Sequence, residues 1–141
     1  AVHDGTPPKN VAVGPMPEYG KYLARSVANS LGCHTQRNLR SGAFTGPPYA
    51  GGMEMEVEGA ADTVLVTPNI TTDPKTGWLA GIGEDDFVAR FRVGTGADGS
   101  HMPWSAYERM TDDDLKALYR FLKTVPPVEN NTDPVRRKKQ N

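Results

Sequence analysis

Glycine and proline form an unusually large part of this chain, with 15 glycines and 12 prolines among 141 residues. Both residues interrupt helices and strands and favour turns, so much of the chain must fold as loops. Because the chain has a single cysteine, no internal disulfide can tie those loops together. With 37% apolar residues, a chain of this size needs additional core volume, and a large apolar cofactor is one source of it.

The charge and hydropathy patterns exclude several classes of function. The formal net charge is −1, which gives no bulk electrostatic reason to bind nucleic acid. No apolar run approaches the roughly 18 residues of a membrane-spanning helix, so no membrane span is expected. The chain does not open with a charged segment and an apolar stretch, so we expect a signal peptide or anchor to be absent from it.

Apolar periodicity predicts three helices. The first runs from Pro17 to Leu31, because Tyr19, Leu23 and Val27 recur every four residues, and Gly32 is its expected stop. The second covers residues 84–93, with acidic residues in its first turn and a glycine at its end. The third begins at the N-cap Thr111, has Asp114 as its capping-box partner, and ends before Pro126 and Pro127.

The rest of the chain has no comparable helical pattern. The acidic stretch 52–62 is typical of a hairpin or surface loop, and residues 63–66 are rich in strand-forming residues until Pro68. We therefore divide the chain into an extended arm (1–15), a folded domain (16–128) and a polar, basic tail (129–141). The run Arg136–Lys139 is expected to be solvated within that tail.

A chemically informative segment is Ser30-Leu31-Gly32-Cys33-His34. The usual haem-attachment motif is Cys-x-x-Cys-His, in which two thiols one helical turn apart reach the vinyl groups of the porphyrin. Here Ser30 occupies the position of the first cysteine, so one thioether is missing. The alternatives are an inert buried cysteine, a Cys–His nucleophilic pair, or a zinc site completed by His3 and His101.

A second axial ligand is expected in a loop before the last helix, where Met102 precedes the rigid Pro103. Met110 competes for this role, but its spacing to Leu115 is that of a hydrophobic staple. His101 is a further alternative, which would give bis-histidine ligation. The stretch Gly94–Gly99 matches G-x-G-x-x-G, yet it follows a helix rather than a strand, so we reject a dinucleotide site.

Taken together, these features resemble a class I cytochrome c domain, closest to the domains that serve bacterial periplasmic dehydrogenases. The matching stretches cover roughly residues 18–128 in the order of the family. They are GKYLARSVANSLGCHTQRN, GPPYAGG, TPNITTDPKTG, EDDFVARFRVGTGADGSHMPW and MTDDDLKALYRFLKTVPPV. The resemblance implies an all-α class I cytochrome c fold, with three main helices and long loops around one haem.

The resemblance also implies roles for individual residues. His34 would be the proximal iron ligand, Met102 the distal ligand, and Cys33 the remaining covalent tether to haem c. Non-covalent binding of the haem is the alternative. The carbonyl of Pro47, or that of Pro48, would accept the hydrogen bond from the proximal imidazole.

Further roles follow for the segment Pro68–Thr71, which would line the haem edge. Within it, Ile70 would contact the haem and Asn69 would bond a propionate, although Asn69 is equally typical of a turn residue. Gly20 and Tyr119 would lie where the first and last helices cross, although Tyr119 is equally typical of a core aromatic residue. Ser30 is the one clear departure from the family pattern.

By resemblance, the function is electron transfer, with haem iron cycling between Fe(III) and Fe(II), so the chain would be a carrier and not an enzyme. Its partners would be a dehydrogenase, a quinol-oxidising module or a terminal oxidase, in the periplasm or another extracytoplasmic compartment. One alternative is an open-site haem protein with peroxidase-like or small-ligand-binding activity. Another is a haem-free interaction module on the same scaffold.

Overall fold

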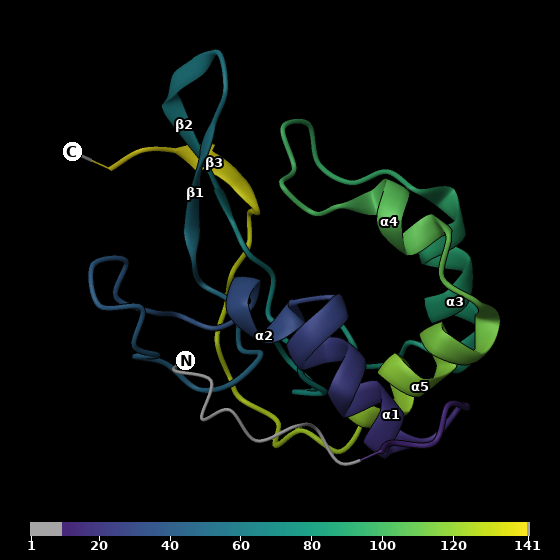
Figure 1. Cartoon of the computed structure of the whole chain (residues 1–141). Coiled ribbons are helices and arrows are strands. Elements are labelled where there is room, and N and C mark those ends of the chain that lie inside the picture. The colour runs from purple at the N-terminus through teal and green to yellow at the C-terminus, as the bar shows by residue number, and fades with distance from the viewer. Residues whose placement is uncertain (1–9, 141) are drawn as a thin grey trace.

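The computed structural model describes residues 10–140, and most of the predicted arm lies outside them. Helices gather on one side and a small sheet stands on the other (Figure 1). In chain order the elements are α1 (Pro17–Tyr22), η1 (Leu23–Val27), α2 (Ser30–Cys33), β1 (Glu54–Val57), β2 (Ala60–Val66), α3 (Glu84–Val93), α4 (Trp104–Glu108), α5 (Asp112–Leu122) and β3 (Arg136–Lys138). None of these helices is long and apolar enough to cross a bilayer.

Two helices form as their sequences predict. Helix α3 carries acidic residues in its first turn and ends at Gly94, whose φ of 70° is the left-handed conformation of a C-terminal glycine. Helix α5 begins with a complete capping box, in which the Thr111 side chain accepts from the Asp114 backbone and the Asp114 side chain accepts from Thr111. Both helices bury phenylalanines or leucines in one common core.

The first predicted helix is broken into three pieces. After α1, the five-residue segment η1 is a π-helix, and Ala28 N–H donates to the Leu23 carbonyl at 2.7 Å. The chain then turns at Asn29, which has a positive φ of 48°, and restarts as α2. Gly32 lies inside α2, so its predicted role as the helix stop is wrong. A π segment changes the direction in which the following residues point, and it often marks a functional site.

Helices α1 and α5 cross at Gly20, as predicted. A Cβ added at Gly20 would overlap the Ala117 carbonyl and lie 2.8 Å from Cβ of Phe121, so only glycine allows this approach. Tyr119 does not lie at the crossing: its ring is 5.5 Å from that of Phe87, and its hydroxyl donates to the Ile82 carbonyl at 2.8 Å. Tyr119 therefore ties α5 to α3 and the segment before it.

Replacing Gly20 with alanine is expected to lower the free energy of unfolding by about 1–3 kcal/mol. The added methyl group meets the Ala117 backbone, which no rotamer change can move away. A matched control is Gly46→Ala, whose new Cβ meets only the exposed side chain of Gln36, at 3.0 Å. Urea denaturation of both variants checks this, and equal losses would contradict it.

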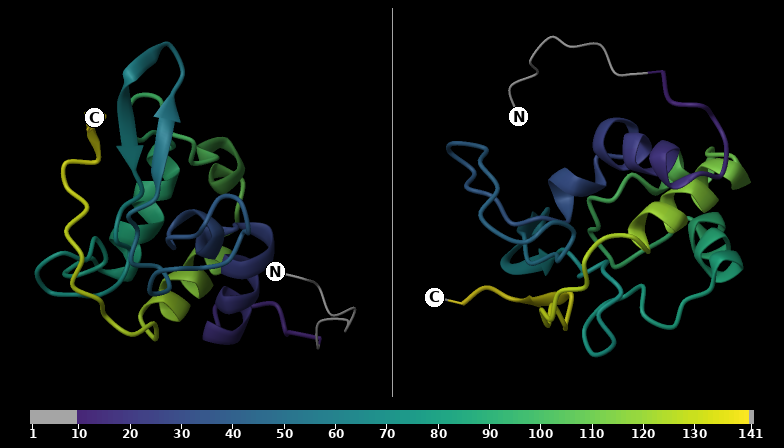
Figure 2. Two further views of the ribbon diagram at one scale, coloured as in Figure 1. Left: turned by 90° about the vertical axis from the view of Figure 1, so that its left-hand side faces the viewer. Right: turned by 90° about the horizontal axis from the view of Figure 1, so that it is seen from below.

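The sheet is the main difference from an all-α fold. Strands β1 and β2 form an antiparallel hairpin within the acidic stretch and the strand-forming residues after it, with a register shift between Glu56 and Val57. Strand β3 adds antiparallel to the other edge of β2, pairing Arg136 with Leu65. Figure 2 shows the hairpin projecting from the body of helices. The prediction of an all-α chain therefore needs the correction that a three-stranded sheet accompanies the helices.

The predicted C-terminal tail is largely folded onto the domain through residue 139. Its basic run pairs as β3, so it is not a free end, although the side chains of Arg136, Lys138 and Lys139 are exposed to solvent. Lys139 lies 3.1 Å from the Glu56 carboxylate. Both side chains are exposed, so this ion pair adds little stability. The boundary at residue 128 remains a prediction, but the sheet depends on residues beyond it.

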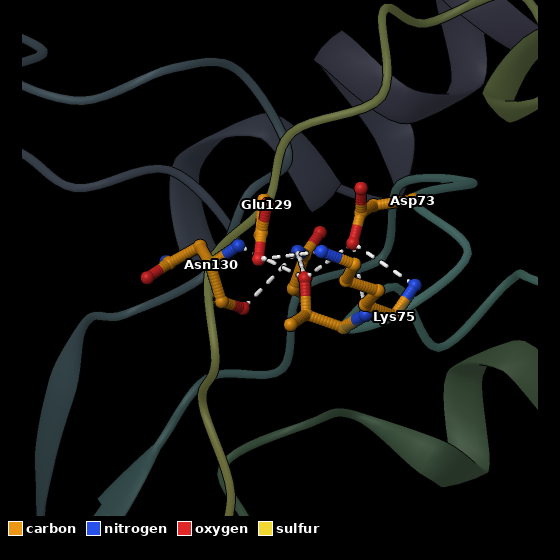
Figure 3. A network of polar contacts seen from close by, with 6 residues as sticks. Asp73, Lys75, Glu129 and Asn130 are labelled. Carbon is orange, nitrogen blue, oxygen red and sulfur yellow. Dashed lines mark hydrogen bonds and ion pairs between the residues drawn. The ribbon is translucent and has the colours of Figure 1, made fainter.

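The segment between α5 and β3 is held to the turn at residues 71–76. Asn130 N–H donates to the Thr76 hydroxyl at 2.9 Å, and the Asp73 carboxylate accepts from Thr76 at 2.8 Å (Figure 3). The hydrogen bond from the Thr76 hydroxyl is the main cause that holds the pKa of Asp73 below its ordinary value. The ion pair of Lys75 and Glu129 spans 3.6 Å between exposed side chains, so it adds little stability.

Candidate functional site

The segment Ser30–His34 lies at the wall of a cavity of about 330 Å³. Helix α2 places Ser30 and Cys33 one turn apart, and both line this cavity together with His34. The start of α2 is held by Tyr107, whose hydroxyl donates to the Ala28 carbonyl at 2.8 Å. Burial raises the pKa of Tyr107, so this hydroxyl stays protonated as a donor.

Only one ring nitrogen of His34 has a hydrogen-bond partner among the described residues. Its Nδ1 lies 2.8 Å from the Pro68 carbonyl oxygen, which can only accept, so Nδ1 carries the proton and Nε2 is unprotonated in the neutral ring. Burial lowers the pKa of His34 below its ordinary value, and the Pro68 carbonyl opposes this only in part. The ring is therefore neutral near pH 7, and neutral imidazole is the form that binds metal ions.

The acceptor for His34 corrects a prediction from the sequence. The carbonyls of Pro47 and Pro48 do not accept from His34; both prolines are exposed, and the Pro47 carbonyl accepts from Ala50 N–H at 3.4 Å. Pro68 fills the role because it follows β2 and reaches His34 across 34 residues of sequence. From the sequence, Pro68 lies in the segment expected at the haem edge, and this placement was the only indication that its carbonyl could lie near His34.

Most of the cavity wall is apolar. It is built from β1 and β2 on one side and from α3, α4 and α5 on others. Its volume is at the lower end of the roughly 300–1,000 Å³ of small-molecule sites. The apolar and aromatic lining residues include Met55, Leu65, Val66, Ile70, Trp78, Phe87, Phe91, Trp104, Leu118 and Leu122. Of the segment Pro68–Thr71, only Pro68 and Ile70 lie in this wall.

Among the competing sulfur ligands, Met102 lies in the cavity wall and Met110 does not. Met110 lines a separate surface groove, and its carbonyl accepts from Arg92 at 2.7 Å. Met55, on β1, also lines the cavity, which the sequence pattern did not predict. Side chains alternate between the two faces of a strand, and this alternation was the only indication that Met55 could point toward the cavity.

Asn69 is not available to a ligand. Its amide nitrogen donates to the carbonyls of Val128 and Asn130 and to the Thr76 hydroxyl, and its amide oxygen accepts from Thr71. Both amide hydrogens are therefore engaged within the protein, and the residue is 1% exposed. The predicted bond from Asn69 to a propionate is replaced by this internal network.

Two features of the site fit a haem: side chains that can bind iron or the porphyrin, and a buried polar atom without a hydrogen-bond partner. His34 offers a free imidazole nitrogen, Met102 a thioether and Cys33 a thiol, all in one apolar wall. In the same wall, the indole Nε1 of Trp104 is buried and lacks a hydrogen-bond partner among the described residues. A buried orphan donor usually indicates a partner supplied by a ligand or water.

A site made only of protein carboxylates, cysteines and histidines does not fit. Within residues 10–140, no three such side chains gather closely enough to hold a metal ion. His3, one of the two histidines of the zinc alternative, lies outside the described residues.

Comparisons with known proteins bear on this site. No family model matches the chain. It is 36% identical over 114 residues to the cytochrome c subunit of alcohol dehydrogenase (quinone) from Gluconobacter oxydans, covering 77% of this chain and 21% of the relative. It is 35% identical over 114 residues to the gluconate 2-dehydrogenase cytochrome c subunit of Pantoea cypripedii, covering 77% and 23%. These relatives support a cytochrome c domain.

A third relative points to the same class of protein. The fructose dehydrogenase cytochrome subunit of Gluconobacter japonicus is 36% identical over 115 residues, which are 78% of this chain and 21% of that protein. The chain thus spans about a fifth of the length of each of these three relatives. The similarity therefore concerns this domain alone.

Proposed function

We propose that this chain is a monohaem cytochrome c domain that carries electrons and catalyses no reaction of its own. The observation that carries the proposal is the free Nε2 of His34 at an apolar cavity that Cys33 and Met102 also line. The similarity to cytochrome c subunits supports the same function.

Each residue of the site has a distinct task in this proposal. His34 would bind the iron through Nε2, while its Nδ1–H bond to Pro68 would fix the ring orientation and make the ligand more electron-donating. Met102 would supply a thioether sulfur as the second protein ligand. Cys33 would form the single thioether, because Ser30 has no thiol to form the other.

When bound, the haem supplies a one-electron couple between Fe(III) and Fe(II). The thioether of Met102 favours the reduced state and raises the reduction potential. Helices α3 and α5 contribute mainly apolar side chains to the cavity wall, and an apolar wall would limit reorganisation when the charge changes. No acid, base or nucleophile of the chain is required.

The names of the relatives suggest the partners. We propose that a dehydrogenase subunit or a quinol-oxidising module donates electrons, and that an acceptor such as a terminal oxidase receives them, in the periplasm or another extracytoplasmic compartment. In this proposal the cofactor is haem c, attached to the protein through one thioether. The alternative is a haem that is bound without a covalent bond.

Replacing Met102 with alanine is expected to abolish the sulfur-to-iron charge-transfer band of the oxidised protein and to open the iron to external ligands. Carbon monoxide should then bind the reduced variant at least about a hundredfold faster, since no internal ligand must leave first. Met55→Ala is the matched control, because Met55 is the other described methionine in the cavity wall. Absorption spectra and stopped-flow mixing with carbon monoxide provide the measurements.

If the wild-type protein bound carbon monoxide as fast as Met102→Ala, its site would be open, as in the peroxidase-like alternative. If Met55→Ala abolished the band and Met102→Ala kept it, the distal ligand would be Met55. Either result would overturn the assignment of Met102.

A further inference from the structure

The loop between α3 and α4, residues 94–103, is attached to the sheet as well as to the helices. Figure 1 shows it reaching from α3 and α4 toward the hairpin of β1 and β2. On the helix side, Arg90 of α3 donates to the Thr95 carbonyl at 2.6 Å. On the sheet side, Arg136 of β3 donates to the Asp98 carbonyl at 2.7 Å. The loop that carries Met102 therefore bridges two parts of the cavity wall.

The contact nearest Met102 is made by His101. Its Nε2 lies 2.7 Å from the backbone carbonyl oxygen of Glu56, so Nε2–H is the donor. Strand β1 is an edge strand, and the register of its pairing with β2 shifts directly after Glu56. Backbone groups at edges and bulges lack a full set of strand partners. The Glu56 carbonyl takes its hydrogen bond from the loop.

Close packing supports the same attachment. Gly99 has a φ of 81°, and a Cβ added there would lie 2.8 Å from a methyl carbon of Val57. The loop backbone thus lies directly against the hairpin, one residue beyond Glu56. On the other side of Met102, the Trp104 N–H donates to the Met102 carbonyl at 2.8 Å and begins α4. Met102 lies between these two anchored points.

We propose that His101 is a positioning residue, which fastens the Met102 loop to the Glu56 carbonyl and so keeps the thioether at the haem iron. This inference rests on the proposed function, because it takes Met102 as the distal ligand. It also assigns His101 a task other than ligation, since the Nε2 of His101 is engaged with the sheet.

The test compares haem-loaded variants of the chain. His101→Ala removes the hydrogen bond, whereas His101→Gln retains a side-chain N–H donor to the Glu56 carbonyl. Asp98→Ala is the matched control, because the Asp98 side chain makes no hydrogen bond or ion pair in the described structure and its carbonyl remains for Arg136. Met102→Ala tests the underlying ligand assignment separately. The readouts are the sulfur-to-iron band and the rate of carbon monoxide binding to the reduced protein.

We expect His101→Ala to keep the haem and to bind carbon monoxide about tenfold faster, the change that loss of one hydrogen bond from the ligated state produces. The sulfur-to-iron band should weaken correspondingly. His101→Gln should recover most of the wild-type rate, and Asp98→Ala should match wild type. Arg136→Ala removes another hydrogen bond between the loop and the sheet, so it should also increase the rate of carbon monoxide binding.

Different results separate the inference from the function. If His101→Ala matched wild type while Met102→Ala lost the band, the function would stand and the positioning role would be overturned. If His101→Ala and His101→Gln were equally fast, the hydrogen bond would not be the cause. If Met102→Ala kept six-coordinate iron and His101→Ala lost it, His101 would be the ligand, and both the inference and the ligand assignment would fail.

Discussion

Replacing Cys33 with serine is expected to release essentially all of the haem into acid–acetone, whereas the wild-type protein should keep its haem in the precipitate. Cys33 is the chain's single thiol, so no other residue can form a thioether. The variant should still show axial ligation by His34 and Met102, because neither residue is changed. Extraction followed by a pyridine haemochrome spectrum provides the measurement.

The complementary variant is Ser30→Cys, which restores the two-cysteine motif. Ser30 and Cys33 lie one turn apart in α2 and both line the cavity, so a thiol at position 30 is placed to attach as well. The haemochrome band should shift from the one-thioether position to the two-thioether position. Extractable haem in the wild-type protein would contradict the covalent bond at Cys33 and favour non-covalent binding.

Replacing Asn69 with alanine is expected to lower the free energy of unfolding by about 2–4 kcal/mol. The Asn69 amide donates to the Val128 carbonyl at 2.8 Å and to the Asn130 carbonyl at 3.2 Å. Its amide oxygen accepts from the N–H of Thr71 at 3.0 Å. Alanine removes all of these hydrogen bonds at a position that is 1% exposed, and only the Val128 carbonyl keeps another donor, the Thr71 hydroxyl. Urea denaturation monitored by circular dichroism provides the measurement.

Asn131→Ala is the control, because Asn131 is exposed and its side chain accepts only from the nearby Asp133 N–H. Its effect should stay within about 0.5 kcal/mol. The haem spectrum of Asn69→Ala should match wild type in the folded protein, since Asn69 has no free donor for the haem. An unchanged stability together with an altered haem spectrum would instead support a direct bond from Asn69 to a propionate.

The parts that could be predicted from sequence are those governed by local chemistry. Helix α5 follows from its Thr111–Asp114 capping box and its apolar spacing, and α3 from its acidic start and the glycine at its end. The contact of Gly20 with α5 was also anticipated, through the resemblance to the family. Caps and periodicity act within a few residues, so they can be read directly from the chain.

The first helix shows where periodicity fails. The recurrence of Tyr19, Leu23 and Val27 every four residues predicts an uninterrupted α-helix. At Leu23, however, the carbonyl accepts from Ala28, five residues later, which is the hydrogen bond of a π-helix. The turn at Asn29 then follows. Nothing in the local apolar pattern distinguishes these two states, because tertiary contacts such as that of Tyr107 with Ala28 select between them.

Contacts between distant segments were the least predictable. The His34 acceptor is Pro68 and not Pro47, although each stands in a Pro-containing loop of suitable composition. Likewise, the basic run at Arg136 looked like a solvated tail, yet it pairs with β2 about 70 residues earlier. The sequence shows that Asn69 carries an amide donor, but it does not show which of several acceptors that donor binds. Only the three-dimensional arrangement decides among them.

The first measurement to make is the visible absorption spectrum of the chain, purified after expression with a haem-maturation system. We expect about one haem per chain and a sharp low-spin α-band in the reduced state. The oxidised protein should show the weak sulfur-to-iron band of Met102 ligation. A folded but colourless protein would overturn the electron-carrier function and leave a haem-free interaction module on this scaffold.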